Sequence, residues 1–255
     1  MPVELTFRDD CAVLTLNRPE ALNALSFSIL GEIGAAIDQA GRSKARALIV
    51  TGAGPKAFCA GADIKELGSR DLMAQKRGAE RGQAVFAKLD DLPIASIAVI
   101  NGYAFGGGLE LALACTFRLA TPNAKMACPE IKLGLIPGYG GTQRLPRIIG
   151  EARALELVMT GRTVDAAEAE RIGLVGKIVS GDPVAEGLSF AKTFTGYSLP
   201  VLGFARSAVQ RALTVPLREG LKIEAELSTL AYRTEDSAEG IAAFAEKRPP
   251  RFRDA

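Results

Sequence analysis

Short apolar segments alternate with a helical stretch along the N-terminal part of the chain. Residues 12–16, 47–51 and 94–100 are mainly apolar runs of the length expected for buried strands. Between the first two runs, residues 26–40 repeat apolar side chains at helical spacing. Strands and helices that alternate in this way predict an α/β fold.

The second half of the chain contains more predicted helices than strands. Residues 109–119 predict an apolar helix, and residues 124–128 predict a short strand. Further helices are expected at 142–149, 152–159 and 166–172, and a last apolar segment at 174–179. From about residue 183 the pattern is helical to the end, interrupted by glycine and proline. We therefore predict an α/β core at residues 1–195 and a helical C-terminal region at residues 196–255.

The composition excludes several classes of chemistry. The sequence contains no histidine, so Ser-His-Asp, Cys-His and HExxH sites are ruled out. Acid–base catalysis would then depend on carboxylates, Lys, Tyr or Cys. The net charge of +2 gives no general attraction to nucleic acids or membranes. The most basic stretch is the tail, residues 247–253, which is either a solvated segment or a contact for a phosphate-bearing ligand.

The sequence predicts a cytoplasmic protein. Four cysteines, at positions 11, 59, 115 and 128, show no CxxC spacing and are typical of reduced thiols. Residues 1–10 carry three acidic side chains instead of the apolar segment of a signal peptide. No apolar run reaches the roughly 18 residues that a membrane span needs.

One glycine motif is a false lead. Residues 51–57, Thr-Gly-Ala-Gly-Pro-Lys-Ala, match GxGxxA after a predicted strand. A loop of small residues follows where a dinucleotide-binding helix should continue, and a single match of this kind is weak evidence. The sequence also lacks the GxxxxGK[ST] pattern of a P-loop.

The segment from Asn101 to Glu110 carries the most informative chemistry. A strand is followed by three glycines, Gly106 to Gly108, and then by a helix. The unpaired amides at a helix N-terminus can stabilise an oxyanion, although a tightly packed turn explains three glycines equally well. Glu110 lies in an apolar helix, where burial should raise its pKa and suit it to proton transfer. The alternative is a structural carboxylate paired with a group such as Arg118.

Two further segments are candidates for the same site. Glu130 follows Pro129 and precedes a glycine-rich loop; taken alone, it fits an ordinary carboxylate at a turn or helix start. Residues 57–66 contain a run of small residues whose amides are suited to face a ligand, or simply to pack under another element. The two glutamates form a site only if both face one cavity, which their spacing does not reveal.

Taken together, these segments resemble the crotonase, or enoyl-CoA hydratase/isomerase, superfamily. The resemblance rests on AFCAGADIKE, NGYAFGGGLELALACTFRLA and PEIKLGLIPGYGGTQRLPRIIG, and it covers nearly the whole chain. It implies a crotonase-like spiral of repeated ββα units with a helical C-terminal trimerisation region. It also implies a homotrimer or a hexamer made of two trimers.

The resemblance further implies a reaction and a set of site residues. The reaction is reversible syn addition of water to a trans-2-enoyl-CoA, giving a 3-hydroxyacyl-CoA, with no metal and no cofactor beyond the coenzyme A of the substrate. Glu110 is implied as base and Glu130 as acid, and both glutamates favour a hydratase. The remaining implied roles are oxyanion donors Ala60 and Gly107, the water-positioning amide of Gly138, and substrate or coenzyme A contacts from Lys56, Ala60, Ala62, Asp63, Ile64, Gly106 and Gly107.

Three other functions remain open at this point. A Δ3,Δ2-enoyl-CoA isomerase needs one carboxylate to move a proton, and other acyl-CoA-specific members of the superfamily share the same scaffold. An RNA-binding homologue is a rival of another class, against which the near-neutral charge and the two glutamates argue. We expect an acyl-CoA thioester as ligand, without a nucleic-acid or membrane partner.

Overall fold

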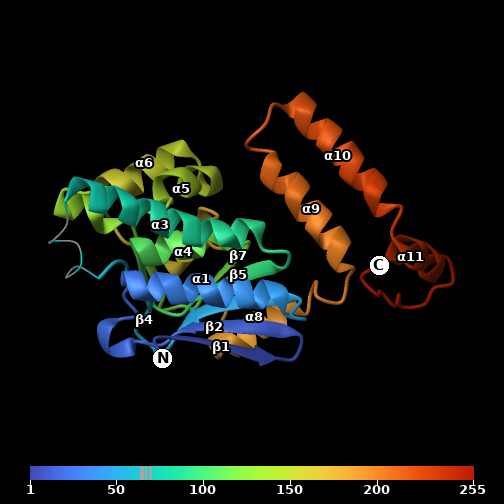
Figure 1. The fold of residues 1–255 in the computed structure, drawn as a ribbon, viewed down its shortest axis with the longest axis horizontal. Helices are drawn as coiled ribbons and strands as arrows, with labels where there is room; N and C mark the ends of the chain where they lie inside the picture. The colour runs from blue at the N-terminus through green and yellow to red at the C-terminus, as the bar shows by residue number, and fades with distance from the viewer. Residues whose placement is uncertain (64–65, 67, 69–70) are drawn as a thin grey trace. The chain divides into compact units, whose positions relative to one another are not determined.

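The computed structural model describes residues 1–63, 66, 68 and 71–255 (Figure 1). Within these residues the chain forms two compact units, Met1–Ala191 and Lys192–Ala255. The roles assigned from the sequence to residues 1–195 and 196–255 stay predictions.

The N-terminal unit contains a six-stranded sheet in the order β1-β2-β3-β5-β7-β10. Its strands are β1 (Val3–Arg8), β2 (Cys11–Leu16), β3 (Ala47–Gly52), β5 (Ala95–Ile100), β7 (Phe117–Ala120) and β10 (Lys177–Ile178). β1 and β2 pair antiparallel, whereas the other neighbours in the sheet are parallel. β3 is buried along its whole length, as expected for a strand inside a parallel sheet that is covered on both faces.

A smaller sheet has the order β4-β6-β8-β9. Its strands are β4 (Ala57–Cys59), β6 (Tyr103–Phe105), β8 (Lys125–Ala127) and β9 (Val164–Asp165). The pairs β3-β4, β5-β6 and β7-β8 each send their first strand to the large sheet and their second to the small one. The helices that follow these pairs are α3 (Leu72–Asp91), α4 (Gly107–Ala114) and, after the 3₁₀ helix η2 (Pro129–Leu133), α5 (Gly141–Ile149). This is the repeated ββα pattern predicted from the sequence.

The remaining helices of the unit include a predicted one, α1 (Phe27–Arg42), whose apolar face is buried. The Ser26 hydroxyl caps α1 by accepting the Ile29 N–H at 3.2 Å, which satisfies one of the unpaired amides of the first turn. In Figure 1, α1 and α3 run side by side, and they pack against each other. The other elements are η1 (Pro19–Ala21), α6 (Glu151–Thr160), α7 (Ala166–Arg171) and α8 (Pro183–Ala191).

The helix predicted at residues 109–119 is wrong in its second half. α4 ends at Ala114, and Phe117–Ala120 forms β7, which pairs with residues 97–100 of β5. All eight residues of α4 are buried. An apolar run buried on every side carries no periodicity that separates helix from strand, so only the pairing with β5 reveals where the helix ends.

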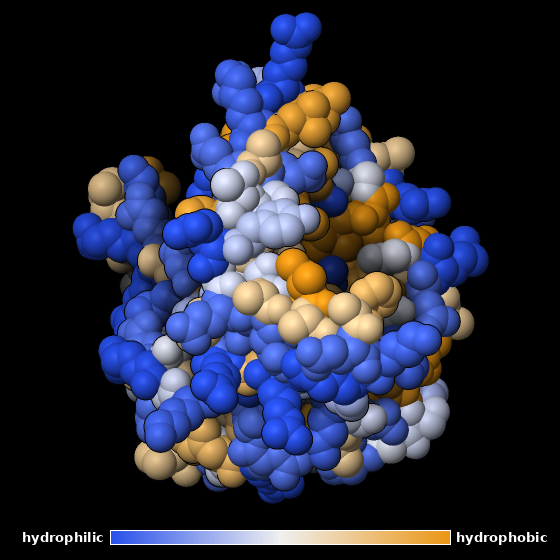
Figure 2. Space-filling view, turned by 90° about the vertical axis from the view of Figure 1, so that its right-hand side faces the viewer, coloured by the Kyte–Doolittle hydropathy of each residue, from blue (hydrophilic) through white to orange (hydrophobic). Residues whose placement is uncertain are grey.

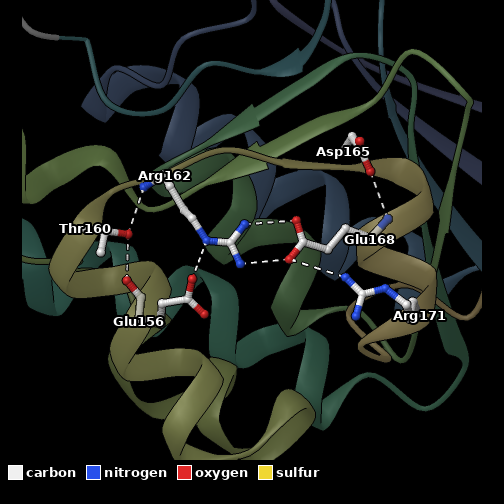
Figure 3. Close-up of polar contacts among 6 residues, drawn as sticks. All are labelled: Glu156, Thr160, Arg162, Asp165, Glu168 and Arg171. Atoms are coloured by element: carbon white, nitrogen blue, oxygen red, sulfur yellow. Dashed lines mark hydrogen bonds and ion pairs between the residues drawn. The ribbon is translucent and has the colours of Figure 1, made fainter.

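An ion-pair cluster joins α6 to α7 near the surface (Figure 3). Arg162 donates to both carboxylate oxygens of Glu168, at 2.9 and 2.7 Å, and to Glu156 at 2.6 Å. Arg171 also lies near Glu168, at 3.8 Å. These side chains are partly exposed to solvent, so we expect the cluster to orient the two helices with little gain in stability.

The C-terminal unit consists of α9 (Leu199–Arg211), α10 (Leu217–Ala231), α11 (Glu235–Ala245) and a tail folded back onto α11. The buried carboxylate of Asp236 accepts the N–H groups of Arg253 at 2.6 Å and Asp254 at 2.9 Å. In the basic tail, Arg248 donates to both oxygens of Glu239, at 2.6 and 2.9 Å. Part of the tail's positive charge is therefore already paired. Across the described residues, the helices are too short or too polar to cross a membrane.

Candidate functional site

Glu110 and Glu130 line one cavity of about 300 Å³ in the N-terminal unit. The cavity lies between α3, the N-terminus of α4 and the segment from η2 to Tyr139. Most of the residues proposed from the sequence meet here: Ala60, Ala62, Gly106, Gly107, Glu110, Glu130 and Gly138. The cavity also has apolar walls, formed by Leu133, Leu135, Ile136 and the small residues Gly78 and Ala79 of α3. A small apolar space with a few converging polar groups is typical of a ligand site.

Glu110 is held by two backbone amides. Its Oε1 accepts the N–H groups of Tyr139 and Gly141, each at 2.7 Å, and the residue is only 2% exposed. Burial raises the pKa of Glu110 to about 7, the Gly141 N–H opposes this rise, and the nearby Glu130 adds to it. A carboxyl with a pKa near neutrality is suited to accept and release protons. The alternative pairing with Arg118 is wrong, because that guanidinium donates to the carbonyls of Leu174 and Cys115.

Glu130 has a different environment. Burial raises the pKa of its carboxyl, and its buried Oε2 has no hydrogen-bond partner among the described residues. Native structures rarely leave a buried polar atom unsatisfied, and those that do often mark a functional site. The oxygen of Glu130 therefore lies ready for a ligand or a water in the cavity.

Gly106 brings Glu130 close to the start of α4. A Cβ placed on Gly106 would lie 2.7 Å from Glu130 Oε1, and Gly106 has a φ of 51°. The positive φ favours glycine, because a side chain there would strain the backbone, and a Cβ would also force the Glu130 carboxylate out of its position. At Gly108, a Cβ would overlap the Cys59 carbonyl of β4. The glycine triplet thus serves close packing as well as the cavity, so both explanations considered from the sequence contribute.

The amide of Ala60 contradicts the predicted role of this residue. Ala60 N–H donates to the Leu22 carbonyl at 3.0 Å, so it is already occupied by the protein. The neighbouring Ala62 is in the opposite situation. Leu25 bonds to the Gly61 carbonyl and to the Asp63 N–H, both at 2.8 Å, and backbone direction alternates along a strand. The Ala62 N–H therefore points away from Leu25, and it has no backbone partner within the described part of the chain.

Gly107 supplies the second N–H group that has no backbone partner among the described residues. It is the first residue of α4, where no intrahelical acceptor exists, and its N–H makes no other backbone bond among the residues described. Because Ala62 and Gly107 both line the cavity, the available amide pair is Ala62 and Gly107. The sequence pointed to the Ala60 amide, whereas the amide that is available lies two residues later, at Ala62.

The remaining predicted contacts lie elsewhere. Lys56 is exposed in the loop before β4 and does not line the cavity. The Asp63 carboxylate pairs with Arg18 at 3.2 Å. Ile64 lies outside the described residues. Coenzyme A contacts by these three residues stay predictions.

Sequence reasoning missed the residues that support Glu110. Tyr139 and Gly141 donate the two amides, and the carbonyl of Gly138 accepts from the side chain of Gln83 on α3 at 2.9 Å. α3 itself was not predicted. The glycine-rich segment GYGGT at residues 138–142 is the signal in the sequence that points to this loop, and it does not identify Glu110 as its partner.

Comparison with known proteins decides the family. The model of the family described as enoyl-CoA hydratase/isomerase matches residues 6–255. The chain belongs to the enoyl-CoA hydratase/isomerase family. It is 46% identical over 242 residues to a protein of Mycobacterium tuberculosis named a probable enoyl-CoA hydratase, covering 94% of this chain and 93% of that one. It is also 40% identical over 246 residues to a crotonyl-CoA hydratase of Syntrophomonas wolfei, covering 94% of each.

The fold comparison agrees with the family assignment. A crystal structure described as an enoyl-CoA hydratase from Bacillus anthracis superposes with a TM-score of 0.95 at 36% identity, covering 100% of both chains. The α/β fold class with its crotonase-like ββα repeats is thereby confirmed. A trimer is not part of this comparison and stays a prediction.

Proposed function

We propose that this protein is an enoyl-CoA hydratase that adds water across the double bond of a trans-2-enoyl-CoA. The observation that carries the proposal is the convergence of Glu110, Glu130 and the amides of Ala62 and Gly107, which have no backbone partner among the described residues, on one cavity. The names of the relatives support it. An isomerase needs only one carboxylate for proton transfer, whereas both carboxylates of this cavity have pKa values raised by burial.

The proposed reaction begins with the thioester carbonyl between the Ala62 and Gly107 amides. When water attacks Cβ, negative charge develops on this carbonyl oxygen, and the two N–H groups stabilise it. The helix dipole of α4, whose N-terminus begins at Gly107, acts in the same direction. Each donor of this kind is typically worth about 10²–10³ in rate.

The two carboxyls divide the proton transfers. The amides of Tyr139 and Gly141 on Oε1 favour the ionised form of Glu110, so Glu110 accepts the proton of the attacking water. Glu130, whose Oε2 lacks such donors among the described residues, carries the proton that is delivered to Cα. A proton then returns from Glu110 to Glu130, through the next water, and restores the starting state. The Gly138 amide, at the edge of the same cavity, positions the water.

Product analysis tests this function. We expect the purified protein to consume crotonyl-CoA with loss of the conjugated enoyl-thioester absorbance and to form 3-hydroxybutyryl-CoA. Conversion of a 3-enoyl-CoA to the 2-enoyl isomer without any hydrated product would instead identify an isomerase. Binding of RNA with a steep salt dependence, and no turnover of either thioester, would support the non-enzymatic alternative.

We also propose that the C-terminal unit joins copies of this chain into a trimer, or into a hexamer of two trimers. Figure 2 shows a face on which apolar side chains gather around a hollow. Within the C-terminal unit, an apolar groove of about 550 Å³ is lined by residues that include Val201, Leu202 and Ile241. Leu217 and Leu221 of α10 are 78% and 54% exposed, and exposed apolar patches mark association sites.

The mass of the protein in solution tests this assembly. We expect light scattering to give three or six times the mass of one chain. Leu217→Glu combined with Leu221→Glu should lower this mass, whereas Leu155→Glu, an exposed leucine of α6, should leave it unchanged. A single-chain mass for the unaltered protein would contradict the proposal.

A further inference from the structure

Among the described residues, Tyr139 is the one large aromatic side chain that lines the catalytic cavity. Its backbone N–H donates to Glu110, so its ring belongs to a residue that is bonded directly to the proposed base. The cavity is lined by the amides of Ala62 and Gly107, by the two carboxylates and by the partly exposed apolar side chains of Leu133, Leu135 and Ile136. An acyl chain whose carbonyl oxygen lies at the amides and whose Cα and Cβ lie at the carboxylates continues along this apolar lining, which also includes the Tyr139 ring.

The ring is fixed from two sides. On α3, a Cβ added to Gly82 would overlap the ring, so the ring lies directly on the helix backbone. On α4, a Cβ added to Gly107 would lie 3.2 Å from Tyr139 Cδ2. Phe86 contacts the ring edge-to-face with centroids 5.8 Å apart. A ring held between two helices and a buried phenylalanine has little freedom to move aside for a ligand.

Gly82 explains how α3 accommodates this ring. It is buried, and its lack of a side chain leaves the space that the ring occupies. Gly78, four positions earlier and on the same face of the helix, lines the cavity. The ring therefore lies between α3 and α4, against the buried Phe86.

We propose that Tyr139 is the residue that limits acyl-chain length, closing the inner end of the cavity so that the enzyme prefers short-chain enoyl-CoA substrates. The inference rests on the proposed hydratase function. It separates two roles of the same residue: the backbone N–H positions Glu110, and the ring sets specificity. Replacement of the ring should therefore change which thioester is hydrated and keep the carboxylate in place.

The test compares Tyr139→Ala with Tyr139→Phe, which retains the ring. For each variant and the unaltered protein, kcat/KM is measured with 2-butenoyl-, 2-hexenoyl-, 2-octenoyl- and 2-decenoyl-CoA. Poorly accommodated methylenes in an apolar pocket change specificity by about 10-fold or more. We therefore expect the octenoyl-to-butenoyl ratio to rise at least about 10-fold in Tyr139→Ala and to stay within about 2-fold in Tyr139→Phe.

A binding measurement separates this proposal from the proposed function. Calorimetry with butyryl-CoA and octanoyl-CoA, which lack a double bond and cannot be hydrated, should show the same shift in the ratio of Kd values. Absence of turnover with every enoyl-CoA would overturn the hydratase assignment, while the Kd ratio would still test the ring. Unchanged ratios in both experiments would overturn the role of Tyr139. If Tyr139→Ala does not fold, Tyr139→Leu carries the same expectation with a smaller shift.

Discussion

Replacing Glu110 with glutamine should abolish activity and at the same time stabilise the fold at alkaline pH. Burial raises the pKa of Glu110 from its ordinary 4.5 to about 7. Between these values the folded chain keeps a proton that the unfolded chain has released, so the free energy of unfolding falls as pH rises. Above pH 7 the carboxyl of Glu110 is ionised in both the folded and the unfolded state, and its titration no longer changes the free energy of unfolding.

The magnitude follows from the size of the shift. One pKa unit corresponds to about 1.4 kcal/mol, so the rise to about 7 destabilises the native state by roughly 3 kcal/mol at pH 8. At pH 5 the destabilisation is only about 1 kcal/mol, because pH 5 lies just above the ordinary pKa of 4.5 and well below the folded-state pKa of about 7. Glutamine stays neutral at every pH, and its Oε1 can still accept the two amides that Tyr139 and Gly141 donate to Glu110.

The assay is urea unfolding at a fixed protein concentration, at pH 5 and pH 8. We expect Glu110→Gln to exceed the unaltered protein by roughly 3 kcal/mol at pH 8 and by about 1 kcal/mol at pH 5. Glu151→Gln, which removes an exposed charge at the start of α6, serves as the control and should not show this pH-dependent gain. The same pH dependence in Glu110→Gln and the unaltered protein would refute the argument that a buried, reluctantly ionised carboxylate occupies this site.

Three further predictions concern the same framework. Gly106→Ala and Gly173→Ala both place a side chain at positive φ, 51° and 79°, and each should lose more than about 1 kcal/mol of stability in urea unfolding. Only Gly106→Ala, whose Cβ would meet Glu130 Oε1 at 2.7 Å, should also lose crotonyl-CoA hydration; equal activity in the two variants would contradict the contact. The pH profile of kcat/KM should fall below about pH 7, because burial raises the pKa of Glu110 to about 7 and the base must be ionised; a flat profile between pH 5 and 8 would argue against Glu110 as base. Arg162→Ala should lower stability by less than about 1 kcal/mol and leave turnover unchanged, because the ion pairs of Figure 3 are partly exposed to solvent; a loss of several kcal/mol would show that the cluster does more than orient two helices.

The sequence predicted the elements whose pattern of apolar residues is distinctive, either a helical period or a short continuous run. The apolar face of α1 and the continuous apolar runs of β3 and β5 were recognised because their patterns are typical of these structures. The end of α4 was not recognised, because all of its residues are buried. α3 was missed because two residues of its buried face, Gly78 and Gly82, are glycines and weaken the apolar pattern. Gly82 has a structural reason, since it makes room for Tyr139.

The site was predictable only where a side chain is unusual in its surroundings. Glu110 was identified because a carboxylate is costly inside an apolar helix. The proposed oxyanion donors are backbone amides, and the sequence does not reveal which amide of a loop is already bonded. Ala60 was therefore chosen, although its N–H is occupied by Leu22 and the N–H of Ala62 points the other way. The backbone hydrogen bonds from Ala60 to Leu22, and between Leu25 and its partners Gly61 and Asp63, fix the direction of these two amides.

The most direct test of the central claim is the rate of crotonyl-CoA hydration by Glu110→Gln and Glu130→Gln, each compared with the unaltered protein under conditions where all three are folded. If the two carboxyls share the proton transfers across one cavity, each substitution should lower kcat by about 10²–10⁴-fold. Full turnover by both variants would contradict the two-carboxylate mechanism.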